Sequence, residues 1–280
     1  MTNLRIMSNN IWWSDGNKAD WEAIGANCSA EARAPGLFRA YQELQPDLLG
    51  LQECSAKMAH LLMSLFAENR MPYAMLWGRD TPIVYRTDRL ELVDSEVLIY
   101  PEEIPGLEGS FNNARTKSYC AALFRLKETG QLLCFATTHL WWKSEDPNRQ
   151  NYQPHSEAAK AWQLGKAIDC VEAFQQKYGC PAVIVGDCNT WPTGKAIQNA
   201  LRRGFVHGHD AAIDFADETQ GMHYCYADGY TTTPYPEGFG QSLDHILIRG
   251  ELTVRRFSRY SPDYYMPLSD HFPVWIDGTL

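Results

Sequence analysis

The sequence predicts an α/β fold in which two mixed β-sheets pack face to face and helices cover their outer faces. Eleven segments are rich in β-branched, aromatic or leucine side chains and end at turn formers, whereas only four show a helical period. Segments 118–127 and 131–140 are joined by Glu128-Thr129-Gly130, which is typical of a hairpin. Antiparallel pairs are therefore expected, so the sheets are not purely parallel.

The expected elements follow one another along the whole chain. Expected strands lie at 3–11, 47–53, 73–77, 82–86, 90–99, 118–127, 131–140, 181–187, 243–249, 252–260 and 272–277. Expected helices lie at 31–45, 55–70, 156–178 and 193–203. The polar stretch 141–156 is interpreted as a loop within one domain, because neither half looks able to close its own core. Residues 1–280 are thus expected to form a single domain.

Charge and missing motifs exclude several function classes. The formal net charge is −9, and the 25 Lys and Arg residues are scattered, which is untypical of a protein that grips long nucleic acid. A substrate with one or a few phosphates remains compatible with that charge. The chain has no P-loop, no dinucleotide-binding glycine fingerprint and no G-x-S-x-G elbow.

Neither a signal peptide nor a membrane span is expected. Residues 1–13 lack a charged segment followed by an apolar stretch and a cleavage site, and no apolar run would cross a bilayer. These observations predict a soluble cytoplasmic protein with no integral membrane segment. The eight cysteines form no C-x-x-C pair and lie mostly in apolar surroundings, which favours reduced core residues over disulfides.

Polar side chains recur at the ends of apolar strand patterns, where open sheets expose functional groups. One such residue alone is more often a cap or turn residue, but the recurrence favours a shared site. Side chains alternate along a strand, so Cys188 is expected to point to the opposite face from Asp187 and Asn189 and to pack in the core. The residues at strand ends are Asn10, Glu53, His139, Asp187, Asn189, Asp244, Asp270 and His271.

Carboxylates and amides without a Cys/His cluster indicate a site for Mg²⁺ or Mn²⁺ rather than Zn²⁺. An Asp and a His at neighbouring strand mouths can pair, and the carboxylate then fixes the imidazole tautomer. Asp270 and His271 precede the last strand, and Asp244 begins an earlier one. A metal site that activates water or binds phosphate is therefore expected.

Six motifs between residues 8 and 274 resemble one known superfamily. "SNNIW", "LQE", "TTHL", "GDCN", "SLDHI" and "SDHFPV", in this order, are similar to the endonuclease/exonuclease/phosphatase superfamily of metal-dependent phosphoesterases, also called the DNase I-like fold. The resemblance implies a four-layered α/β sandwich with the site at one end, between the sheets. It places Asn10, Glu53 and Asp270 at the metal, with Glu53 as a direct ligand.

The same resemblance implies roles for the other motif residues. His139 would contact the scissile phosphate, and Asp187 would orient or deprotonate the attacking water. Asn189 would hold a phosphate oxygen or the nucleophile. His271, oriented by Asp244, would stabilise the pentacovalent transition state.

Aromatic and basic residues beside these motifs are candidate substrate contacts. Two tryptophan pairs, at 12–13 and 141–142, flank the expected site, and alternation predicts that at least one member of each pair is buried. Arg115 is preferred over Lys117 as a phosphate contact. The stretch 205–242 is expected to help shape the substrate pocket. The proposed substrate-binding residues are Trp12, Trp141, Trp142, Lys143 and Arg115.

The expected activity is metal-dependent hydrolysis of a phosphoester, with a phosphodiester favoured, by in-line attack of an activated water. Nucleic acid and a small molecule both remain open as substrate, as do a phosphomonoesterase on a sugar or inositol phosphate and a lipid-headgroup phosphodiesterase. A non-catalytic binding module of the same fold is a remote alternative. Hydrolysis through Cys54 or Cys188 would require a thiolate that faces the site. The oligomeric state is left open.

Overall fold

A computed structural model describes residues 2–13, 25, 27–215 and 242–280. In this part of the chain, one seven-stranded and one six-stranded sheet are present. The first sheet has the strand order β10 (Asp214–Phe215), β12 (Thr253–Arg259), β13 (Val274–Thr279), β1 (Asn3–Asn10), β2 (Leu48–Gln52), β4 (Ile83–Arg86), β3 (Tyr73–Leu76). The second has the order β5 (Leu90–Ile99), β6 (Ser118–Leu126), β7 (Leu132–His139), β8 (Ala182–Asp187), β11 (Asp244–Arg249), β9 (Val206–His207).

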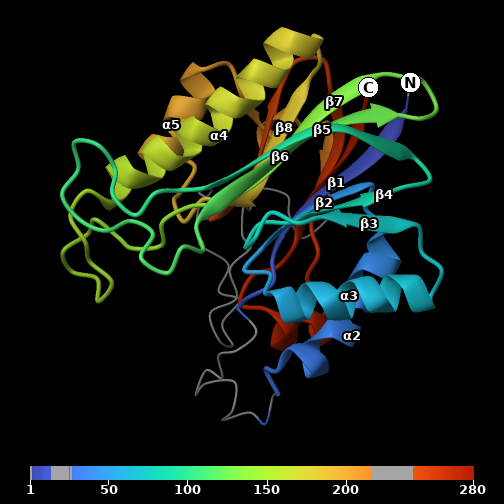
Figure 1. Cartoon of the computed structure of the whole chain (residues 1–280), viewed down its shortest axis with the longest axis horizontal. Helices are drawn as coiled ribbons and strands as arrows, with labels where there is room; N and C mark the ends of the chain where they lie inside the picture. The colour runs from blue at the N-terminus through green and yellow to red at the C-terminus, as the bar shows by residue number, and fades with distance from the viewer. Residues whose placement is uncertain (1, 14–24, 26, 216–241) are drawn as a thin grey trace.

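Helices cover both outer faces. α2 (Ala30–Leu44) and α3 (Ala56–Glu68) pack on the first sheet, and α4 (Ser156–Tyr178) and α5 (Lys195–Arg202) pack on the second (Figure 1). The short helix α6 (Gly208–Ala211) and the 3₁₀ helix η2 (Asp263–Leu268) complete the described elements. The expected four-layered α/β sandwich is confirmed. None of the described helices is long and apolar enough to cross a membrane.

The space between the sheets is filled by apolar side chains from both. Leu4, Ile6 and Leu48 of the first sheet belong to one buried cluster with Phe135 and Val183 of the second. Burial of such side chains contributes about 1.5–3 kcal/mol each to the stability of the fold. This apolar layer holds the two sheets at a fixed separation, and it ends where the polar strand termini begin.

Gly50 lies where the two sheets pack closely beneath these termini. A Cβ atom at this position would lie 2.5 Å from Cγ2 of Val185 and 2.7 Å from Cβ of Thr137, both on the opposite sheet. A larger residue would force the sheets apart, since such contacts are shorter than van der Waals distance. The glycine of "PDLLGLQE" therefore permits the close packing that supports Glu53.

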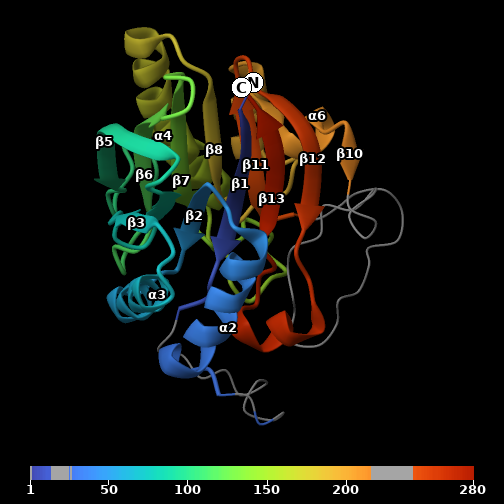
Figure 2. The same cartoon turned by 90° about the vertical axis from the view of Figure 1, so that its right-hand side faces the viewer.

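Strand direction determines which ends meet. β1 runs parallel to β2, and β7 runs parallel to β8, whereas β13, β4, β6 and β11 run antiparallel to these strands. The carboxyl ends of the four parallel strands and the amino ends of their antiparallel neighbours therefore lie at one edge of each sheet. β1 and β13 lie side by side, which brings the first and last strands together (Figure 2).

The expected elements agree closely with the observed ones, apart from the region after α5. There the chain forms the two-residue strands β9 and β10 and the four-residue α6, which are too short to leave a period in the sequence. Most of the stretch expected to shape the pocket, 216–241, lies outside the described residues.

Candidate active site

The sheet register brings polar residues from both sheets to one edge. His139 lies opposite Asp187 in the pair β7–β8, and Asp187 lies opposite Asp244 in the pair β8–β11. Asn10 ends β1, and Glu53 directly follows β2, its parallel neighbour. Because parallel strands carry their carboxyl ends to the same edge, these five side chains converge at one end of the sandwich.

The backbone leaves regular geometry where it delivers these side chains. Glu53 and Asn189 have φ of 57° and 50°, the left-handed region that most residues avoid. Gly186, with φ of 149°, has no room for a side chain, because a Cβ would lie 1.9 Å from the carbonyl oxygen of Thr138. Backbone strain of this kind, held in place by the surrounding structure, concentrates at functional sites.

Asn10 connects the two carboxylates across the sheets. Its Nδ2 donates to Oδ2 of Asp187 at 3.0 Å and to Oε1 of Glu53 at 3.3 Å. Its Oδ1 accepts from the backbone N–H of Trp12 at 2.9 Å, which fixes the orientation of the amide. The other Glu53 oxygen accepts from the N–H of Trp13 at 2.7 Å. The amide therefore stands between two acceptors that would otherwise repel each other.

His139 lies between an acid and a base, both buried. Its Nδ1 is 2.8 Å from Oδ2 of Asp80, and its Nε2 is 2.5 Å from Nζ of Lys117. Burial and the nearby Lys117 charge lower the pKa of His139 to about 4, so the ring is neutral at pH 7. In the neutral ring Nδ1 donates to Asp80, and Nε2 accepts from Lys117. Burial raises the pKa of Asp80 to about 6 and lowers the pKa of Lys117.

His271 has the opposite electrostatic character. Burial disfavours its charged form, but Asp244 and Asp187 outweigh this and raise its pKa to about 10. Nδ1 of His271 donates to Oδ2 of Asp244 at 2.6 Å, and its Nε2 lies 3.9 Å from Oδ2 of Asp187. The site therefore holds one neutral imidazole and one cationic imidazole on either side of Asp187.

The donor set fits a hard divalent cation. Ligand atoms of Glu53, His139 and Asp187 lie within 4.8 Å of one another, and no other such group of His, Cys, Asp and Glu occurs in the described chain. Two of the three donors are carboxylates, which Mg²⁺ and Mn²⁺ prefer. The nitrogen of His139 is a poorer donor for such an ion, because Lys117 occupies its lone pair. The placement of Asp270, which is half-buried and directly precedes His271, near the metal stays a prediction.

Comparison with known proteins agrees with this geometry. The sequence profile described as the endonuclease/exonuclease/phosphatase family matches residues 10–271, which is nearly the whole chain. The chain belongs to this family. No curated protein matches it by sequence.

Solved structures with the same fold include members with different stated activities. The endonuclease/exonuclease/phosphatase from Bacteroides vulgatus is 17% identical over 100% of both chains, with a TM-score of 0.75. The mannosyl-6-phosphatase of Bacteroides thetaiotaomicron is 19% identical over 99% of this chain and 100% of its own, with a TM-score of 0.74. D. rerio TDP2, solved with a single strand DNA product, is 18% identical over 100% of both chains, with a TM-score of 0.62. At these identities the likeness shows the fold alone.

In this endonuclease/exonuclease/phosphatase family chain, the tryptophan pairs divide as alternation predicts. Trp12 and Trp141 are 5% and 2% exposed, whereas Trp13 and Trp142 are 39% and 47% exposed. The guanidinium carbon of Arg33 lies over the ring of Trp12, 5.2 Å from the centre of that ring. Trp142 is thus the more accessible of the expected aromatic contacts, and the buried Trp12 is better placed to support the site than to stack on a ligand.

The basic residue at the centre of the site is Lys117 rather than Arg115. Arg115 is exposed, and its carbonyl accepts from Nε of Arg79. Lys117 lies directly before β6 and is buried against His139. Because β6 runs antiparallel to β7, residues before β6 lie beside the end of β7, and this register is the signal that would have favoured Lys117.

Two further residues near the site were missed in the sequence. Asp80 precedes β4, whose amino end lies at the same edge, so the antiparallel register could also have found it. Arg33 resembles an ordinary charged residue of α2, yet it is buried and donates to the carbonyl oxygens of Ile11, Trp12, Cys28 and Leu268. These contacts join the segment after Asn10 to the segment before Asp270.

The cysteines beside the site are not poised for chemistry. Cys54 and Cys188 are buried, and burial raises the pKa of both thiols. A thiol kept neutral in this way is a weak nucleophile. The interpretation of both as packing residues fits their positions, with Cys188 in the cluster beneath α4 and α5.

Proposed function

We propose that this protein hydrolyses a phosphoester, and a phosphodiester is favoured, by in-line attack of a water on phosphorus. The observation that carries the proposal is the position of Oδ2 of Asp187, which is 3.0 Å from Nδ2 of Asn10, 3.5 Å from Nε2 of His139 and 3.9 Å from Nε2 of His271. This oxygen accepts from the Asn10 amide and faces both imidazoles, and a carboxylate in such a position can hold a water and receive its proton.

The neighbouring residues divide the remaining tasks. Asp187 orients and deprotonates the water, and Asn189, whose N–H donates to Oδ1 of Asp187 at 2.8 Å, holds an adjacent oxygen. Lys117 donates to a phosphate oxygen from its ammonium group, and His139, which lies beside that ammonium, contacts the scissile phosphate when its Nε2 is protonated. His271 is cationic at pH 7 and stabilises negative charge as it develops on the phosphoryl oxygens. Asp244 orients the His271 ring through their hydrogen bond.

The proposed cofactor is Mg²⁺ or Mn²⁺. Glu53 binds it directly, and Asn10 and Asp270 complete the metal side of the site. When bound, the ion polarises a phosphoryl oxygen and neutralises part of its charge. Arg33 joins the backbone that follows Asn10 to the backbone that precedes Asp270.

Similarity alone leaves the ester class open. One structural neighbour is named a mannosyl-6-phosphatase and another was solved with a single strand DNA product, so neighbours of this fold differ in the phosphate compound with which they are described. The net charge of −9 favours a compact ligand over a long polyanion. We propose that residues 1–280 act as one catalytic unit.

A substrate panel tests the proposal. Purified protein is assayed with bis-p-nitrophenyl phosphate, p-nitrophenyl phosphate and short single and double DNA strands in Mg²⁺ or Mn²⁺. Hydrolysis of at least one ester is expected, with a loss on the order of 10²-fold or more in Asp187→Asn and in His271→Ala. Asp169→Asn, on the exposed face of α4, is the matched control. Full activity in both site variants would contradict the assigned roles.

A further inference from the structure

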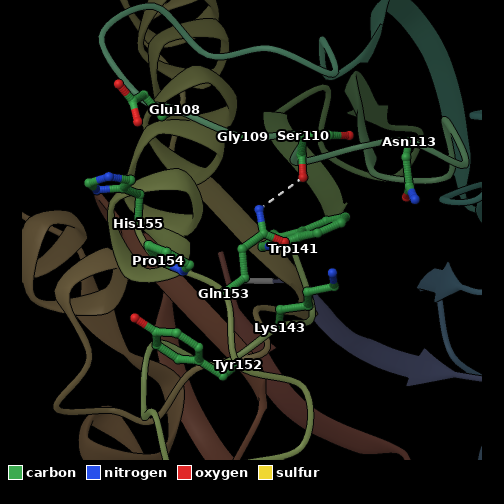
Figure 3. Close-up of a pocket in the computed structure, with 10 residues that line it drawn as sticks. All are labelled: Glu108, Gly109, Ser110, Asn113, Trp141, Lys143, Tyr152, Gln153, Pro154 and His155. Atoms are coloured by element: carbon green, nitrogen blue, oxygen red, sulfur yellow. Dashed lines mark hydrogen bonds between the residues drawn. The ribbon is translucent and has the colours of Figure 1, made fainter.

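A cavity lies beside the proposed catalytic residues. It has a volume of about 500 Å³ and opens between the loop that precedes β6 and the loop that follows β7 (Figure 3). Ser110 and Asn113 line it from the first loop, and Lys143 and Tyr152 line it from the second. Volumes of this size accommodate a small organic ring with its substituents.

The walls of this cavity are held in place by buried hydrogen bonds. Gln163 of α4 donates from Nε2 to the carbonyl of Phe111 at 3.1 Å and accepts from the N–H of Trp141 at 2.7 Å. It thereby joins the two loops through one buried amide. Nε2 of Gln153 donates to the carbonyl of Ser110 at 3.0 Å, and this hydrogen bond connects the same two loops a second time (Figure 3). A cavity fixed in this way needs little reorganisation to bind a ligand.

Both loops are continuous with the catalytic residues. Trp141 lines the cavity and follows His139 by two residues, and the carbonyl of the intervening Leu140 accepts from Nδ2 of Asn189. On the other wall, Asn112 accepts from the N–H of Lys117 at 2.9 Å and donates to its carbonyl at 2.8 Å. The cavity therefore lies next to the side of the site that is formed by Lys117, His139 and Asn189.

We propose that this cavity is a subsite for a hydroxyl-rich ring, a sugar or a cyclitol, that is esterified to the phosphate. The inference rests on the proposed function, because it assigns the organic part of the same substrate. It adds Tyr152, Asn113 and Ser110 to the residues that determine specificity. It also assigns Lys143 to the residues that line the subsite.

The lining side chains match such a ring. Tyr152 is 44% exposed and offers an aromatic face on which the C–H groups of a sugar pack. Asn113, Ser110 and Glu108 supply neutral and anionic hydrogen-bonding groups for hydroxyls, and Lys143 adds a cationic donor. A polyol uses donors and acceptors together, which is what these four side chains provide.

The same lining is unsuited to two other ligands. Among the described residues, Lys143 is the one Lys or Arg that lines the cavity, whereas a nucleic-acid strand requires several cations along its backbone. A lipid chain requires continuous apolar walls, and here polar groups alternate with the aromatic ones. A ring with many hydroxyls satisfies more of the lining groups than either ligand.

Paired substrates test this subsite. Wild type, Tyr152→Ala and Asn113→Ala are compared on glucose 6-phosphate against p-nitrophenyl phosphate, and on glycerophosphoinositol against bis-p-nitrophenyl phosphate. The first pair is used if wild type hydrolyses monoesters, and the second pair is used if it hydrolyses diesters. Each variant is expected to lower kcat/KM for the hydroxylated ester, relative to its nitrophenyl partner, by about tenfold. Val93→Ala, an exposed change on β5, is the control for surface mutation.

The outcomes separate the two levels of the proposal. If wild type hydrolyses none of these esters and none of the DNA strands of the substrate panel, the proposed function itself is wrong. If it hydrolyses the nitrophenyl esters but the selectivity ratio is the same in wild type and both variants, the subsite is wrong and the catalytic assignment stands. A preference of wild type for short oligonucleotides that is lost in Tyr152→Ala would also overturn the sugar assignment.

Discussion

Asn10 and Asp187 join the two β-sheets at the end of the proposed active site through a hydrogen bond of 3.0 Å from Nδ2 to Oδ2. The two residues are 177 positions apart and terminate β1 and β8, which belong to different sheets. The bond is buried, so water does not compete with it. The separation of the sheets therefore sets the distance between Asp187 and Asn10, one of the residues proposed to hold the metal.

Replacing Asn10 tests this link. Asn10→Ala removes the donor that separates Asp187 from Glu53, and we expect kcat to fall on the order of 10²-fold. The concentration of Mg²⁺ for half-maximal activity should also change, since the two carboxylates then face each other without a donor between them. Asn69→Ala, at the exposed carboxyl end of α3, serves as the control. An unchanged kcat and Mg²⁺ dependence in Asn10→Ala would show that the bond is only structural.

Asp80 should act by orienting His139. Asp80→Asn weakens the acceptor for Nδ1 of His139, and we expect kcat/KM to fall about 10- to 100-fold, the usual range for residues that orient a functional imidazole. Asp88→Asn is a matched control, because Asp88 follows β4 and forms an exposed ion pair with Arg86. Equal activities in the two variants would exclude a role for Asp80.

Lys117 should contribute phosphate affinity. Lys117→Met removes the buried charge beside His139, and we expect the inhibition constant for inorganic phosphate to rise about tenfold, with partial recovery in Lys117→Arg. Arg115→Met should cause a smaller rise, because Arg115 is exposed. Lys127→Met, beyond the end of β6, controls for loss of surface charge. A larger effect at Arg115 than at Lys117 would reverse the assignment made from the structure.

Local pattern was sufficient for most of the fold and for the strand-end residues. "VIVGDCN" predicts a buried strand that ends in polar residues, and alternation correctly assigns Cys188 to packing. The residues that could not be assigned in this way depend on contacts between distant strands. Asp80 and Lys117 precede strands, so their proximity to His139 follows only from the antiparallel pairing of β4 and β6.

The burial of Arg33 and the structure of the region after α5 could not be predicted from the sequence, for different reasons. In the sequence, Arg33 resembles an exposed charged residue of a helix. Its burial depends on contacts with the segments around Ile11 and Leu268, which are distant in the chain. The strands β9 and β10 have two residues each, and no period can be read from two positions. Both features are products of tertiary packing rather than of local preference.

A buried histidine pair should make stability depend on pH. His245 lies between the carbonyl of Thr190 and Nε2 of His207, each at 2.9 Å, and burial lowers its pKa to about 4. The unfolded chain binds a proton at His245 near pH 6.5 and the folded chain does not, so the free energy of unfolding falls as pH drops from 6.5 to 4. The contribution of His245 to this loss is about 3 kcal/mol.

Chemical denaturation at several pH values checks this expectation. His245→Gln should be less stable than wild type at pH 7, because its partners lose a hydrogen bond, and should lose less stability between pH 6.5 and 4. His60→Gln, an exposed change on α3, should retain the wild-type slope. A slope in His245→Gln as steep as that of wild type would show that His245 does not titrate in this window.

The most direct test of the central claim is the dependence of ester hydrolysis on a divalent cation. Wild-type protein is treated with EDTA, dialysed, and assayed on the best substrate of the panel before and after addition of Mg²⁺ or Mn²⁺. We expect activity to be lost on chelation and restored by either ion, and Glu53→Gln to require a higher ion concentration than wild type. Activity that survives EDTA undiminished would contradict the account.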